Sequence, residues 1–108
     1  SRVPDTYSTS VPHREDIPDG MTPAQYGLKL ALDKAEAYDW KGAMDIWFEF
    51  LESHDALKRA AAEYNIAVAC YMLGDFVLAQ QWLDKSVAEN DMPTLTEAMR
   101  KRIEARKK

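Results

Sequence analysis

The side chains best suited to chemistry in this sequence are two histidines, each close to two acids. The two sets are His13 with Glu15 and Asp16, and His54 with Glu52 and Asp55. A metal site needs ligands paired at helical or turn spacing, which neither set supplies. Both sets are typical of exposed, polar loops, so we expect no metal at either histidine.

The single cysteine and the closely spaced carboxylates do not indicate catalysis either. Cys70 has no partner for a disulfide within the chain, and its apolar surroundings predict a buried, inert thiol. Four carboxylates at helical spacing predict a solvated acidic face, because an acid–base pair would need burial to separate its pKa values: Asp33, Glu36, Asp45 and Glu49. The four glycines form no phosphate-binding loop. We therefore predict a protein that is not an enzyme and needs no cofactor.

Length and charge describe the domain that carries these residues. The chain has 108 residues, enough for one domain, and no apolar run long enough to cross a membrane. Its net charge of −4 is uneven, since residues 94–108 hold six basic and two acidic side chains. Such an end can contact nucleic acid or a membrane, or be a solvated helix face. No aromatic residues alternate with these charges, so we expect no nucleic-acid partner and no direct membrane insertion.

The first part of the chain differs from the rest. Four of the five prolines lie within residues 1–23, which favours an extended segment over residues 1–21. This segment also carries Val3, Tyr7, Val11 and Ile17, which a purely solvated linker does not need. We expect part of it to lie against the folded body. Because the chain begins with Ser1, we also expect it to be a piece of a longer protein.

From Thr22 to the end, the pattern is helical and no alternating β pattern is present. Asp39 and Asp75 are predicted helix caps, and Gly74 suits the left-handed position that ends a helix. The sequence thus predicts an all-α domain over residues 22–108. It divides into one helix pair at about 24–53, a second at about 56–91, and a final capping helix at about 93–107.

The two helix pairs resemble each other. Asp39-Trp40-Lys41-Gly42-Ala43 corresponds to Asp75-Phe76-Val77-Leu78-Ala79 at a spacing of 36 residues. The second pair, with Tyr64-Asn65-Ile66-Ala67 and Gly74-Asp75-Phe76, resembles a tetratricopeptide repeat, whose period is 34 residues. The first pair departs from that pattern, because Tyr38 stands where the turn glycine belongs and Gly27 where a large residue is usual.

The resemblance implies an α-α superhelix whose first helices line a peptide-binding groove. Carried onto this chain, the groove residues are Leu28, Leu32, Tyr64, Asn65, Val68, Tyr71 and Met72. Tyrosine and methionine suit an apolar peptide. The alternative interpretation is that these residues are core, covered by the N-terminal segment or the last helix. Trp40, Trp47 and Trp82 are likewise either a ligand platform or, as we expect at this spacing, core.

The expected function is protein–protein interaction, with a peptide, a partner domain or the remainder of its own chain as partner. The alternative is a structural or oligomerisation domain of a larger protein. A looser similarity, to tetratricopeptide-like modules of bacterial envelope proteins of unknown function, would place the chain in the bacterial cell envelope or periplasm.

Overall fold

The computed structural model describes residues 17–18 and 29–107, and this part of the chain is all-α, with no strand. Its helices are α1 (Lys29–Glu36), α2 (Trp40–Phe50), α3 (Ala56–Met72), α4 (Phe76–Glu89) and α5 (Pro93–Lys107). The expected beginning of the first helix near Thr22 lies outside the described residues. None of the described helices is long and apolar enough to cross a membrane.

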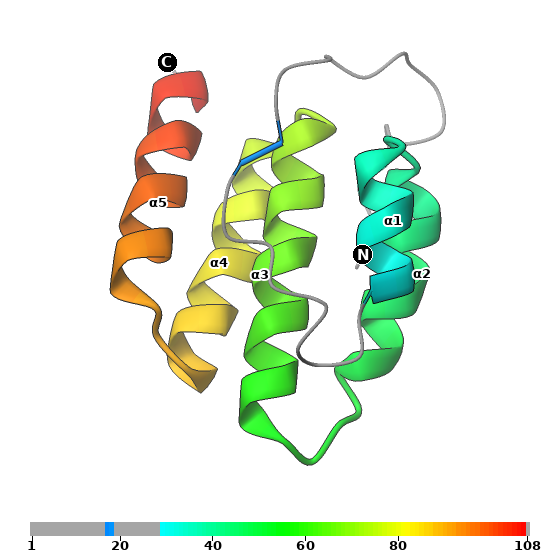
Figure 1. Ribbon diagram of the computed structural model, residues 1–108. Coiled ribbons are helices and arrows are strands. Elements are labelled where there is room, and N and C mark those ends of the chain that lie inside the picture. Colours follow the sequence, from blue (N-terminus) through cyan, green and yellow to red (C-terminus); the bar gives the residue numbers. More distant parts are fainter. Residues whose placement is uncertain (1–16, 19–28, 108) are drawn as a thin grey trace.

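Each helix packs against the next one along the chain, and α3 occupies the middle of the row. Figure 1 shows α1 and α2 on one side of α3, and α4 and α5 on the other. Every residue of α3 from Ala60 to Met72 is buried. Small side chains let α3 and α4 approach closely where they meet, namely those of Ala60, Ala67 and Ala79. A helix buried on nearly all sides is a core helix.

The three tryptophans belong to this core, as we expected. Trp40 and Trp47 on α2 are almost fully buried, and so is Trp82 on α4. The Trp82 ring lies 5.9 Å from that of Phe48, which joins α2 to α4, and the ammonium of Lys85 lies 5.6 Å from its centre. Their burial confirms the core interpretation over a ligand platform.

The turn between α1 and α2 and the turn between α3 and α4 have the same geometry, although only the second contains a glycine at the left-handed position. Gly74 has φ +88°, and Tyr38 at the equivalent position has φ +62°. After α3, the Asp75 amide donates to the Cys70 carbonyl at 2.9 Å; after α1, the Asp39 amide donates to the Lys34 carbonyl at 2.8 Å. Each turn is a Schellman motif, in which a left-handed residue satisfies the last carbonyls of the helix.

The same two turns also start the next helix in the same way. The Asp39 carboxylate accepts from the Gly42 amide and the Asp75 carboxylate from the Leu78 amide, both at 3.0 Å. Both predicted caps are thus confirmed. A Cβ on Gly42 would lie 2.4 Å from the Asp39 carboxylate, so glycine permits this close cap. The sequence spacing of 36 residues is therefore a structural repeat of the whole turn.

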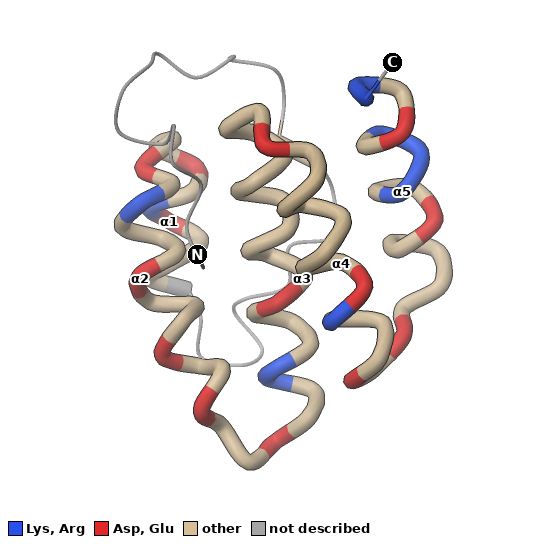
Figure 2. Tube along the Cα trace, turned by 180° about the vertical axis from the view of Figure 1, so that it is seen from behind, with Lys and Arg blue, Asp and Glu red and all other residues tan. Residues whose placement is uncertain are grey.

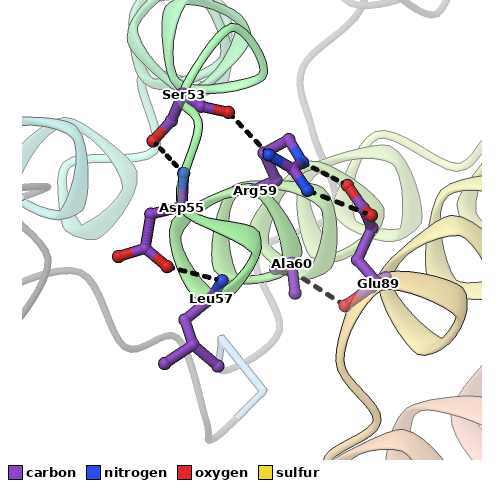
Figure 3. A network of polar contacts seen from close by, with 7 residues as sticks. Ser53, Asp55, Leu57, Arg59, Ala60 and Glu89 are labelled. Atoms are coloured by element: carbon purple, nitrogen blue, oxygen red, sulfur yellow. Dashed lines mark hydrogen bonds and ion pairs between the residues drawn. The ribbon is translucent and has the colours of Figure 1, made fainter.

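A polar network ties the beginning of α3 to the end of α4. It includes a helix cap at Asp55, which the sequence analysis assigned only to an exposed, polar loop. Asp55 caps α3 by accepting from the Leu57 amide at 2.9 Å. Arg59 then donates to both carboxylate oxygens of Glu89 and, at 2.7 Å, to the Ser53 carbonyl (Figure 3). This ion pair fixes the α2–α3 loop and the end of α4 to one guanidinium.

Candidate peptide-binding groove

The predicted groove residues of α3 share one side of that helix, but they are not an open surface. All five of them are buried: Tyr64, Asn65, Val68, Tyr71 and Met72. On α1, Leu32 is half-buried. Leu28 lies outside the described residues. A peptide can therefore reach α3 at these positions only by replacing whatever covers them.

Part of that cover comes from the N-terminal segment. Ile17 is half-buried against the core and Pro18 is buried, and neither belongs to a helix or strand. Figure 1 shows this short stretch near the upper ends of α3 and α4. The prediction that part of the segment lies against the folded body is thus confirmed at these two residues.

Pro18 forms one wall of a pocket of about 220 Å³ between α3 and α5. The other walls are Tyr64 of α3 and one face of α5, namely Thr94, Leu95, Ala98, Met99 and Arg102. The sequence analysis named the last helix as a possible cover of the groove residues, but it assigned no residue of that helix to a site. The signal was present, since Arg102 follows Leu95 by seven residues and Met99 by three, on one helical face.

Asn65 adds an unusual polar feature beside Tyr64. Its side chain is fully buried, and neither the amide oxygen nor the amide nitrogen has a hydrogen-bond partner. A buried polar group without a partner costs about 1–3 kcal/mol. Asn65 is one of the groove residues that the family resemblance implies, and the structure leaves its hydrogen-bonding capacity unused.

Farther along α5, an arginine is held between two aromatic rings. The Arg106 guanidinium lies 5.3 Å from the centre of the Phe76 ring and 5.7 Å from that of Tyr71. One of its nitrogens is 3.5 Å from the Tyr71 hydroxyl. This stacking fixes the end of α5 against α3 and α4, and it places a positive charge on the same helical face as Arg102.

Among the described residues, the carboxyl group with a strongly raised pKa is Glu63, which does not line the pocket. Burial raises the pKa of Glu63 to about 7, and the nearby negative charge of Glu89 adds to the rise. Lys85 and Arg59 act in the opposite direction. The hydrogen bond from Arg59 lowers the pKa of Glu89. This cluster lies in the α3–α4 contact, which makes it a structural feature of that interface.

The side chains considered for catalysis do not converge. Cys70 is buried, and burial raises its pKa to about 12, as expected for an inert thiol. His54 and the four carboxylates of the predicted acidic face are exposed. No group of three metal-ligating side chains occurs among the described residues, and His13 lies outside them.

Comparison with known proteins yields a family and no function. No curated protein and no solved structure matches this chain. A family model described as "Domain of unknown function (DUF6340)" matches residues 29–106, which spans all five helices almost completely. The chain therefore belongs to the DUF6340 family.

Proposed function

We propose that this protein is a non-enzymatic, tetratricopeptide-like module that mediates protein–protein interaction by binding an extended segment along α3 and α5. One observation carries the proposal: Ile17 and Pro18, which form no helix or strand, lie against the helical body, and Pro18 forms a wall of the pocket together with Tyr64. Pro18 thus lies beside Tyr64, one of the groove residues that the family resemblance implies.

A structural or oligomerisation role is the alternative, and it rests on α1. Leu30 is 63% exposed on this helix, which stands at one end of the described row. In stacked helical repeats, an apolar end face is usually covered by another unit. Self-association through α1 would leave the pocket between α3 and α5 unused.

Selection of linear peptides from a displayed library tests the proposal, with the full chain carrying Ile17→Ser as bait so that the contact of Ile17 with the core is weakened. We expect enriched peptides whose binding is lost with Ala98→Leu, because Ala98 is exposed and lines the pocket. Ala105→Leu is the matched control, since Ala105 is also exposed on α5 but is not part of the pocket. Failure to enrich any peptide, together with a stable dimer by light scattering, would favour the oligomerisation role.

A further inference from the structure

The ion pair that joins α3 to α4 has two further charged side chains beside it. Arg59 of α3 donates to both carboxylate oxygens of Glu89, the last residue of α4, and to the Ser53 carbonyl (Figure 3). Glu63 of α3 and Lys85 of α4 lie within the electrostatic reach of this pair. Figure 2 shows charges of both signs on the lower halves of these two helices. Each helix thus contributes one cation and one carboxyl group to a single cluster.

Glu63 and Lys85 are not paired with any of the described residues. Glu63 is buried, and its Oε1 atom has no hydrogen-bond partner. Lys85 is exposed, and its ammonium lies 5.6 Å from the centre of the Trp82 ring. Burial is the main cause that raises the pKa of Glu63 to about 7, so this carboxyl is neutral at lower pH. A buried carboxyl without a partner suits the neutral form, because burying an unpaired charge is costly.

The spacing within each helix offers a second set of pairs. Glu63 follows Arg59 by four residues on α3, and Glu89 follows Lys85 by four residues on α4. Side chains four residues apart lie next to each other on a helix surface, and opposite charges at this spacing attract. Each helix therefore carries a cation and a carboxyl group that can pair without the other helix.

We propose that this cluster is a proton-controlled switch: when Glu63 loses its proton, Arg59 turns from Glu89 to Glu63, and Lys85 pairs with Glu89. The ion pair between α3 and α4 is then replaced by one ion pair within each helix. Ser53 also loses its hydrogen bond from Arg59, so the α2–α3 loop and the end of α4 are released together. The switch does not depend on the peptide binding proposed above.

Burial explains why the ionised Glu63 takes the guanidinium from Glu89. An ionised carboxylate that is buried without a partner destabilises the fold, and a charged donor offsets much of that cost. The Glu89 side chain is 31% exposed, so water and Lys85 can solvate it after Arg59 has turned away. The charge of Asp55, at the cap of α3, acts on Arg59 in both arrangements.

The release is confined to one end of the contact between α3 and α4. One turn farther in, the Ser86 hydroxyl donates a buried hydrogen bond of 2.8 Å to the Ala60 carbonyl, and this bond joins the helices independently of the charges. α5 begins at Pro93, shortly after Glu89, and its first turn lines the pocket beside Tyr64. The switch therefore acts on the connection that places α5 against the rest of the fold.

Amide hydrogen exchange measured by NMR on the full chain tests the release. The Asn90 amide donates to the Ser86 carbonyl at 2.9 Å and reports on the end of α4; the Ala43 amide donates to the Asp39 carbonyl at 3.0 Å and reports on the first turn of α2. From pH 5.5 to pH 8.0 we expect the protection factor to fall about tenfold at Asn90 and to change less than about twofold at Ala43.

Two variants assign this fall to its cause. Glu63→Gln should hold the protection factor of Asn90 constant over the same pH range, because the side chain can no longer ionise. Glu97→Gln, at an exposed position of α5, is the matched control and should keep the fall. An equal fall at Asn90 and Ala43 would reveal a general loss of stability and overturn the switch, as would a fall that persists in Glu63→Gln.

Double-mutant cycles test the exchange of partners, with equilibrium constants of unfolding measured in urea. Between Arg59→Gln and Glu89→Gln we expect a coupling of about fivefold at pH 5.5 and none at pH 8.0. Between Lys85→Gln and Glu89→Gln we expect coupling at pH 8.0 alone. The second cycle leaves Arg59 intact, so it decides even where Arg59→Gln does not fold. Coupling of Arg59 with Glu89 at pH 8.0, or none of Lys85 with Glu89 there, would overturn the exchange.

Discussion

A single carboxyl group, Glu63, should control much of the response of this fold to pH. It is 8% exposed, and its Oε1 atom is buried without a hydrogen-bond partner. Burial and the charge of Glu89 disfavour its ionised form more than Arg59 and Lys85 favour it. Since the pKa rises from 4.5 in the unfolded chain to about 7 in the folded one, the folded state binds more protons between these values. Stability therefore falls as pH rises through this window.

Replacing the Glu63 carboxyl with a neutral group of the same shape should remove the fall in stability at rising pH. We expect Glu63→Gln to raise the free energy of unfolding at pH 8 by an amount on the order of 2–3 kcal/mol, and to change it little near pH 4.5. Urea unfolding at several pH values measures the effect. Glu97→Gln, at an exposed α5 position, is the control and should keep the slope of the original protein. An unchanged slope in Glu63→Gln would show that the carboxyl is not the cause.

At the scale of an element, the α1–α2 turn and the α3–α4 turn show which features the local sequence determines. The caps Asp39 and Asp75 and the turn at Gly74 were predictable, because side-chain hydrogen bonds and a left-handed φ depend on neighbouring residues only. The first turn was less predictable, since Tyr38 adopts a left-handed conformation that disfavours side chains. Its ring is half-buried and lies edge-on to Trp40, with centroids 6.0 Å apart. Packing thus compensates for the backbone there.

The second turn allows the cost of this conformation to be measured in isolation. A Cβ added at Gly74 would meet no atom within 4 Å, so the only penalty of Gly74→Ala is its backbone angle. We expect a loss of about 1 kcal/mol in stability, and a smaller loss for Gly74→Asn, because asparagine tolerates this region better. Thermal unfolding of both variants measures the order. An alanine variant as stable as the original would contradict the turn geometry.

At the scale of the whole molecule, the sequence predicted the helices well and the pocket poorly. Helix spacing and caps are local, so the all-α fold followed from them. The pocket joins Pro18 to Tyr64 and Met99, from three distant parts of the chain. No local sequence pattern indicates a contact between residues so far apart in the chain. The predicted groove residues of α3 were correctly grouped on one side, and the N-terminal segment and the last helix were named as alternative covers, but no local pattern showed that both would meet at Tyr64.

The contact of Ile17 with the core links a residue outside the helices to the stability of the whole fold, and it can be tested by mutation. Ile17 packs half-buried against the core from outside the helices, so Ile17→Ala should lower the free energy of unfolding by about 1 kcal/mol. Leu30→Ala is the matched control: this aliphatic residue is 63% exposed, and its truncation should change stability by less than about 0.5 kcal/mol. Urea unfolding of the two variants side by side gives the comparison. Equal, negligible effects of the two substitutions would mean that Ile17 does not pack against the helices, and the observation on which the proposed peptide binding rests would be removed. A loss of stability with Ile17→Ala alone would show that this residue outside the helices stabilises the helical body.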